Sequence, residues 1–292
     1  MSLTQILPIV MQLSIGLIVF CVALETEPGD VAYLLRRPSL MLRSLIAMNV
    51  IMPILAVLIA VVCKLRPELK VALILLAVAP VPPVLPNKHA KAGGNVSYGI
   101  GLMLFAAILS LVTVPLSVWM ITSLFGRAVQ VPMSLVAKVL GFSIIVALIL
   151  GLLVKRLFPS FERFAGSLSK IGTAIALLAL IPVLLVTWRR IVGEVGEFTV
   201  IAIALFTLVG LFVGHVLGGP DSEDRTVLAL STATRHPGVA LALASAVAAD
   251  KAAVSAAVLL AAFVSVIVTS PYVKWRSRVH APAAAPATHI AR

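Results

Sequence analysis

The polar chemistry of this 292-residue chain is concentrated in one short segment inside an apolar stretch. Residues 231–238 read STATRHPG, and apolar residues lie on both sides of them. The guanidinium of Arg235 can donate two parallel hydrogen bonds, a geometry that suits a carboxylate, a sulfonate or a phosphate. A guanidinium within such an apolar stretch therefore predicts a binding site for an anion.

Other polar side chains are candidates for the same site. His236 can titrate near neutral pH and carry a proton, or it can bond to a free carbonyl oxygen beside a broken helix. Neighbouring hydroxyls can serve a substrate or an ion, although such hydroxyls more commonly bond to their own helix. The expected substrate-binding residues are Arg235, His236, Thr234, Thr232, Ser231, Asn87 and Asn49.

No carboxylate is expected beside Arg235. All eleven acidic residues fall in predicted loops or at the ends of apolar runs. A charge at the centre of a bilayer costs about 2.5–3.5 kcal/mol on insertion scales and normally has a partner. Asp224 and Asp250 lie 11 and 15 residues from Arg235, or about 16 and 22 Å along a helix. We therefore expect the counter-charge to be a bound anion. The alternative, that Arg235 caps carbonyl groups at a helix break, does not exclude this role.

Two apolar stretches carry helix-breaking residues. A proline removes an N–H donor and clashes with the preceding turn, so the proline-rich residues 79–87 cannot form a regular helix. The freed carbonyl groups must be satisfied by protein or water, because lipid offers no donor. The alternative is an ordinary kink, as expected at single prolines elsewhere. The predicted breaks are at Pro80, Pro82, Pro83, Pro86, Pro237 and Gly238.

The elements that position these residues are membrane-spanning helices. The chain is 61% hydrophobic and only 12% charged, with a mean hydropathy of +1.14. Its apolar runs are long enough to cross roughly 30 Å of hydrocarbon. Although the net charge is +12, lysine and arginine lie at the ends of these runs, a pattern that sets membrane orientation. We therefore expect a lipid bilayer as the environment and no nucleic-acid partner.

The sequence predicts an all-α integral membrane protein with about nine spans. These are 6–24, 40–62, 69–86, 96–125, 135–154, 171–188, 198–217, 226–249 and 252–273. Residues 1–275 form one transmembrane domain, and residues 276–292 are expected to be a disordered cytoplasmic tail. The distribution of lysine and arginine favours an N-terminus outside and a C-terminus inside, and we expect a plasma (inner) membrane location.

The two interrupted spans indicate an internal repeat. Four spans lie between 69–86 and 226–249, so the two are five places apart in the order of spans, and because five is odd they run through the membrane in opposite senses. Broken spans at matching positions of oppositely oriented halves are typical of transporters with inverted repeats and a midplane binding site. The oligomeric state is left open.

The chain resembles the bile acid:sodium symporter family, in the order and spacing of its motifs more than in identity. The residues that carry the resemblance are Gly16 to Leu24, Pro28-Gly29-Asp30, Arg36-Arg37-Pro38, Ile51-Met52-Pro53, Pro80, Gly94-Asn95-Val96, Pro115-Leu116 and Ala233 to Leu241. The resemblance implies core helices at about 40–125 and 198–273, panel helices at about 6–24 and 135–188, and two broken helices that cross. It also implies alternating access for organic anions such as steroid conjugates or smaller carboxylates.

The departures from the family pattern concern its sodium sites. Leu85 and Pro86 align with a Ser-Asn pair, and Gly99 and Met103 with hydroxyl residues. The remaining differences are Ser231 for a glutamate, Arg235 for a glutamine and Met48 for a second glutamine. We therefore expect no metal site or cofactor and weak or no sodium coupling, as in an exchanger, a uniporter or a proton-linked carrier. Sodium remains open as the coupling ion.

Two other classes of function stay as alternatives. A channel or sensor on the same scaffold would require a continuous polar stripe, whereas the polar residues of this chain are concentrated at one depth of the membrane. An intramembrane enzyme is disfavoured because the chain has no His-Glu-x-x-His, no Gly-x-Ser-x-Gly and no paired intramembrane aspartates.

Overall fold

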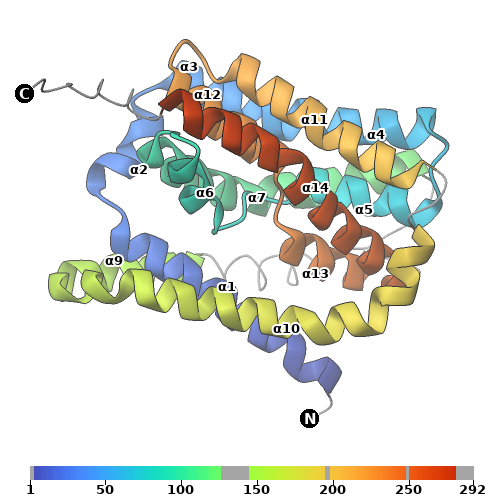
Figure 1. Cartoon of the computed structure of the whole chain (residues 1–292), viewed down its shortest axis with the longest axis horizontal. Helices are drawn as coiled ribbons and strands as arrows, with labels where there is room; N and C mark the ends of the chain where they lie inside the picture. The colour runs from blue at the N-terminus through green and yellow to red at the C-terminus, as the bar shows by residue number, and fades with distance from the viewer. Residues whose placement is uncertain (1–2, 126–144, 195–197, 248–249, 281–292) are drawn as a thin grey trace, which may run out of the picture.

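A computed structural model describes residues 3–125, 145–194, 198–247 and 250–280, and these residues form helices and no strands (Figure 1). The first half contains α1 (Leu3–Glu25), α2 (Pro28–Leu35), α3 (Pro38–Leu45), the π-helix η1 (Ile46–Ile51), α4 (Met52–Val62), α5 (Pro67–Val78), α6 (Leu85–Lys91) and α7 (Val96–Phe125). The second half contains α9 (Ala147–Leu157), the 3-10 helix η3 (Pro159–Phe164), α10 (Ala165–Glu194), α11 (Thr199–Leu217), α12 (Ser222–Ala233), α13 (Pro237–Val247) and α14 (Lys251–His280).

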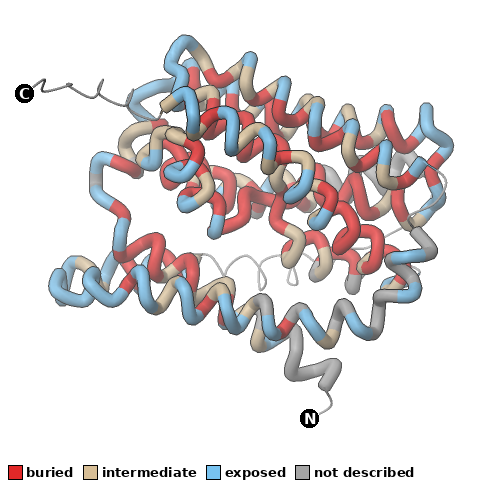
Figure 2. The backbone as a smooth tube through the Cα atoms, viewed as in Figure 1, coloured by how far each residue is buried: buried red, intermediate tan, exposed pale blue. Residues whose placement is uncertain are grey.

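The helices form two groups. In Figure 1, α1, α9 and α10 lie along the lower side, and we call them the panel group. The helices α2–α7 and α11–α14 pack together above them, and we call these the core group. Figure 2 shows buried residues gathered along the inward sides of the core group. The interrupted elements α5–α6 and α12–α13 both belong to the core group.

Long apolar helices make this an integral membrane protein. In the described part of the chain, 38–62, 199–217 and 251–280 are long and apolar enough to cross a bilayer. On α11, large apolar side chains recur every three or four residues on the exposed side over about 22 Å. A face of this kind suits lipid rather than water. Its members are Ile201, Leu205, Leu208, Phe212 and Val216.

Most predicted spans correspond to helices, with two corrections. The predicted span 69–86 is divided, because α5 ends at Val78 and a further helix, α6, begins at Leu85 after the proline run. The predicted tail begins too early. Residues 276–280 complete α14, and Arg276 is buried there. Residues 281–292 and much of the predicted span 135–154 lie outside the described residues. The total of nine spans remains a prediction.

Glycines let α11 approach α12 closely. A Cβ atom added at Gly214 would lie 2.4 Å from the carbonyl oxygen of Leu228, and one at Gly210 would lie 3.0 Å from Cα of Ala233. Small residues at helix interfaces allow this backbone contact in membranes. The contact brings the last turns of α12 close against α11.

Candidate functional site

The first interruption follows from the prolines after α5. Val78 is the last residue of α5, and Ala79 adopts extended backbone angles (φ −67°, ψ 145°). In a continuous helix the carbonyls of Val78 and Ala79 would accept from residues 82 and 83. Both of those residues are prolines and have no N–H to donate. The chain therefore leaves the helix with unused acceptors and resumes it at Leu85.

The second interruption lies between α12 and α13. Ala233 ends α12, Thr234 is extended (φ −114°, ψ 120°), and Pro237 opens α13. Proline suits the first position of a helix, because its missing N–H would have no partner there. The Nδ1 atom of His236 accepts a long hydrogen bond (3.4 Å) from the backbone N–H of Val239, so His236 caps the start of α13.

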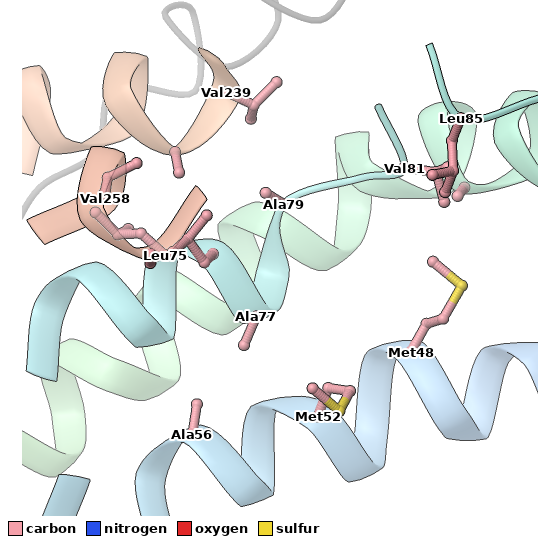
Figure 3. Packing of buried hydrophobic residues seen from close by; sticks show 14 of the residues in the cluster. Met48, Met52, Ala56, Leu75, Ala77, Ala79, Val81, Leu85, Val239 and Val258 are labelled. Atoms are coloured by element: carbon pink, nitrogen blue, oxygen red, sulfur yellow. The ribbon is translucent and has the colours of Figure 1, made fainter. Parts of the chain in front are cut away.

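The two interruptions touch. The backbone N–H of His236 donates to the carbonyl oxygen of Pro80 at 3.0 Å, so the extended segment 234–236 crosses the segment after Ala79. Figure 3 shows the stretch from Ala79 to Val81 between Val239 of α13 and the helix that carries Met48 and Met52. The backbone segments of the two interruptions therefore meet at this hydrogen bond.

Arg235 lies at this crossing and is 6% exposed. Its Nη2 donates to the carbonyl oxygen of Met48 at 2.7 Å, and its Nη1 donates to that of Ala79 at 3.3 Å. Its Nε has no hydrogen-bond partner among the described residues. No ion pair between Arg235 and an acidic side chain occurs in the described ranges. Arg235 therefore has the capping role that the sequence left open, and its charge has no side-chain counter-charge in that part of the molecule.

Backbone irregularities explain why these two carbonyls are free. The carbonyl of Met48 would normally accept from Met52, but η1 has π-helical bonding and the N–H of Met52 donates to Ala47 instead. A π-helical partner for Met48 would be residue 53, which is Pro53 and has no N–H. Together with the Pro83 effect on Ala79, this leaves two main-chain oxygens whose charge density attracts a cation.

The other predicted site residues differ from one another in their burial and in their hydrogen bonds. Thr232 donates to its own helix at Leu228 (2.7 Å), as hydroxyls in helices commonly do. Thr234 Oγ1 and His236 Nε2 are buried without a hydrogen-bond partner among the described residues. Asn49 lies half-buried in η1 and Asn87 is exposed on α6, and neither makes a described hydrogen bond to Arg235.

His89 is a site residue that was not predicted from the sequence. This residue lies on α6, is fully buried, and places Nε2 at 3.2 Å from Oγ of Ser231 on α12. Its Nδ1 has no partner in the described part of the structure. Because α6 was not expected as a helix, residues 87–95 counted as a loop, and a loop histidine carried no signal.

Unsatisfied polar atoms gather at the crossing. Buried polar side-chain atoms in proteins almost always have a hydrogen-bond partner, and each exception calls for an explanation, such as a bound ligand, ion or water. Within the described residues four such atoms lack one, and all four lie on α6 or on the segment between α12 and α13. They are His89 Nδ1, Thr234 Oγ1, Arg235 Nε and His236 Nε2.

A second polar network lies at the start of α12, away from the breaks. Nη1 of Arg37 donates to Asp224 (3.0 Å) and to Tyr33 Oη (2.5 Å), and Tyr33 in turn donates to Asp224 (3.0 Å). Asn95 Nδ2 donates to Tyr33 at 2.9 Å. Burial raises the pKa of Asp224, while Tyr33 and Arg37 oppose that rise. Burial and the nearby Asp224 raise the pKa of Tyr33 to about 12. This network joins α2, α7 and α12 at one end of the core group.

Comparison with known families gives one match. A model described as the sodium bile acid symporter family matches residues 12–195. The match runs from α1 to the end of α10 and so includes the first interruption, whereas the second lies beyond it. A search of curated proteins finds no match to the chain.

Proposed function

This chain belongs to the sodium bile acid symporter family, and from that premise we propose that it is a secondary active transporter of a small organic anion with little or no sodium coupling. It is an integral membrane protein of a transporter family rather than of an enzyme family. The substrate, the mechanism and the coupling ion are the subject of the proposal.

The observation that carries the proposal is the uncompensated charge of Arg235. A buried charge is costly unless it is paired and hydrogen-bonded. Two carbonyl oxygens meet the second need, but they carry no net charge, and the described acidic residues do not meet the first. An anion that binds beside Arg235 supplies the missing charge. The unpartnered atoms of Thr234 and His236 offer it further hydrogen bonds.

Helix ends at the crossing support the same polarity. Both α6 and α13 begin at their interruptions, and the N-terminal end of a helix favours negative charge. Arg235 follows the C-terminal end of α12, where a positive charge is favoured. The crossing thus combines a fixed cation at one helix end with an anion-attracting end at another.

The arrangement of the helices supports alternating access between two inverted repeats. Packing is reciprocal, since α5 contacts α13 and α14 while α12 contacts α6 and α7. Such reciprocity is expected when two halves are related by a two-fold axis in the membrane plane. In this proposal the core group moves against the panel group and exposes the crossing to one side of the membrane at a time.

The weak sodium dependence that we propose follows from the two carbonyl oxygens that hold Arg235. Sodium, like other hard cations, needs oxygen ligands, and main-chain carbonyls are common suppliers. Here the carbonyl oxygens of Met48 and Ala79 are already taken by a covalently attached cation. Its charge is permanent, because a guanidinium stays protonated in proteins. A bound sodium ion is therefore not needed to attract the anion.

Thermal unfolding of the purified protein tests this proposal. Steroid conjugates such as taurocholate and small mono- and dicarboxylates are added in NaCl and, separately, in choline chloride. A ligand that binds only the folded state stabilises it by RT ln(1 + [L]/Kd), which is about 2.7 kcal/mol at 100 times Kd. We expect at least one anion to raise the midpoint equally in both salts.

Two variants localise the effect. Arg235→Gln retains a donor for one carbonyl but has no charge, so we expect the anion-induced shift to disappear. Arg276→Gln is the matched control, because Arg276 is also buried (4% exposed) but donates to Ser222 and Thr226 at the far end of α12. It should lower the midpoint without removing the anion response. Stabilisation that requires sodium, or that survives in Arg235→Gln, would contradict the proposal.

A further inference from the structure

His89 is the polar side chain of the core group whose burial is hardest to explain by structure alone. It lies in the last turn of α6 and is 0% exposed. One ring nitrogen meets Ser231 of α12 at 3.2 Å, and the other has no partner among the described residues. A structural histidine in such a place normally uses both nitrogens, because a buried polar atom without a partner costs about 1–3 kcal/mol.

The neighbouring helix leaves room for the ring at one position. A Cβ atom added to Gly99 of α7 would lie 2.4 Å from Nδ1 of His89. With the imidazole in this position, no residue larger than glycine fits at residue 99. His89 thus contacts α7 through Gly99 and α12 through Ser231, and it lies between three helices of the core group.

We propose that His89 is the proton-binding site of the transporter and that a proton accompanies the anion. An imidazole is the side chain whose ordinary titration falls between pH 5 and 8. The lone pair of an unprotonated ring nitrogen accepts a proton from water on one side of the membrane and forms an imidazolium. The same proton leaves to water on the other side, and no other bond changes. The inference rests on the transport function proposed above and names its coupling ion.

The charged groups near His89 do not supply the negative charge that would balance an imidazolium, so we assign that role to the bound anion. Lys88 of α6 is a cation and donates to Thr269 of α14. Asp224, in the first turn of α12, is engaged by Tyr33 and Arg37. On α7, Tyr98 shares a hydrogen bond with Ser44. The other titratable groups on these elements are Lys91, Glu223, Arg225, Lys251, Tyr272, Lys274, Arg276, Arg278 and His280. No described carboxylate pairs with His89, so an anion bound at the crossing would balance an imidazolium.

His236 is less suited to carry the proton, although it is equally close to the crossing. Its Nδ1 accepts from Val239 at the start of α13, and protonation there would abolish the cap. A positive charge at a helix N-terminus is also unfavourable. His89 lies instead in the last turn of α6, where the helix dipole favours a cation.

The experiment uses the full chain in liposomes, in potassium buffers without sodium, with valinomycin holding the membrane potential at zero. Radiolabelled taurocholate is the probe, because its sulfonate stays ionised and carries no proton by itself. His89→Gln keeps a group that can hydrogen-bond to Ser231 but cannot titrate. His215→Gln is the matched control, since His215 pairs with Tyr272 between α11 and α14, away from the crossing.

With one proton per anion, an inward gradient of one pH unit should concentrate taurocholate about tenfold inside wild-type and His215→Gln liposomes. In His89→Gln liposomes the ratio should stay near one while exchange without a gradient continues. If His89→Gln loses all exchange, Ser231→Ala is the second variant that tests the proposal. It keeps the imidazole but removes its partner, so the pH profile of exchange should shift.

The outcomes separate the two claims. Gradient-driven accumulation that is unchanged in His89→Gln overturns the assignment of the proton to His89 and leaves the transport function intact. An unshifted pH profile in Ser231→Ala, where His89→Gln is inactive, overturns it as well. Absence of wild-type taurocholate uptake under every cation counts against the proposed function itself, and accumulation driven only by sodium contradicts both.

Discussion

Arg235 is a buried cation that is held by the main chain. Most buried guanidinium groups pair with a carboxylate, and breaking such a pair is strongly destabilising because it leaves an uncompensated charge. In the described part of this protein the arginine has carbonyl partners only. The charge is therefore positioned but not neutralised. Arg276 is likewise buried without a described carboxylate partner, but its acceptors are hydroxyls and a carbonyl at a helix end, so it is the arginine against which the ligand role proposed for Arg235 is compared.

Substituting lysine at this residue separates charge from geometry. Arg235→Lys keeps the positive charge, but a single ammonium lacks the planar fork that reaches the carbonyls of Met48 and Ala79 together. Losing one hydrogen bond to a charged group should lower the free energy of unfolding by about 1.5–3 kcal/mol. Anion stabilisation should weaken but persist. Chemical denaturation with and without the anion measures both effects, and an unchanged stability in Arg235→Lys would contradict the bridging role.

The Asp224 network predicts a pH dependence of stability. Burial raises the pKa of Asp224 above that of an unfolded aspartate, so the folded protein holds this proton more tightly than the unfolded chain. The resulting stabilisation is complete below the unfolded pKa of about 3.9 and is lost as the pH rises through the folded pKa. Asp224→Asn cannot ionise, so its stability relative to wild type should increase from pH 4 toward neutrality. Melting curves across this range test the sign, and Asp221→Asn, at the exposed partner of Arg37, is the control. A relative decrease would contradict the direction of the shift.

At the level of elements, the sequence predicted helix ends well where prolines and glycines mark them. The expected span 96–125 coincides with α7, and the chain leaves regular helix at Pro82 and Pro83 and just before Pro237, whereas Pro86 and Gly238, also expected as breaks, lie within α6 and α13. The sequence did not predict α6, because this helix is only about two turns long and follows a run of prolines. Its formation depends on tertiary contacts with α7 and α12. His89 was missed for the same reason.

The role of Arg235 was only partly predictable. Its residue type and its helix break identified a charge inside the membrane. Its acceptors could not be identified, since they are main-chain atoms of residues 48 and 79, and any residue type carries a carbonyl. Likewise, the last turns of α14 read as a basic tail, and the burial of Arg276 depends on hydroxyls of α12 that lie about 50 residues earlier in the chain. Long-range partners of this kind are not encoded in local pattern.

The close contact between α11 and α12 can be tested by adding one methyl group at the interface. At Gly214 the added Cβ would meet backbone atoms of Leu228 and Ala229 at 2.4–2.6 Å, and backbone atoms cannot rotate away. We expect Gly214→Ala to lower the free energy of unfolding by about 1–3 kcal/mol, as overpacking does. Gly166→Ala is the matched control, because nothing lies within 4 Å of its Cβ position. Thermal melting compares the pair, and equal midpoints would show that the two helices can separate at no cost.

At the scale of the whole molecule, orientation can be read from the two native cysteines. Cys63 is exposed just after α4, whereas Cys21 is buried within α1. With the N-terminus outside, the end of α4 faces the outside as well. A membrane-impermeant maleimide should therefore label intact right-side-out vesicles at Cys63. Cys21→Ser should label like wild type and Cys63→Ser should not label. Labelling that appears only after permeabilisation would indicate the opposite orientation.

The panel group and the core group differ in the kinds of polar contact that they contain. Every buried side-chain polar atom without a hydrogen-bond partner in the described residues belongs to the core group, on α6 or on the segment 234–236. The described ion pairs of the panel group join Lys155 of α9 to Glu27, just before α2, and to Glu162 of η3. We expect the panel group to serve as the surface against which the core group moves, and the substrate to contact mainly the core group.

The acceptors of Arg235 also bear on how such a site changes during evolution. They exist because prolines at 53 and 83 delete hydrogen-bond donors, and the side chains at 48 and 79 play no part in the contact. Substitutions at residues 48 and 79 can accumulate freely so long as size is kept, while the two prolines and the arginine must persist together. Related chains with this arrangement should therefore be recognised by the spacing of imino acids relative to one arginine, a signature that a comparison of polar residues would pass over.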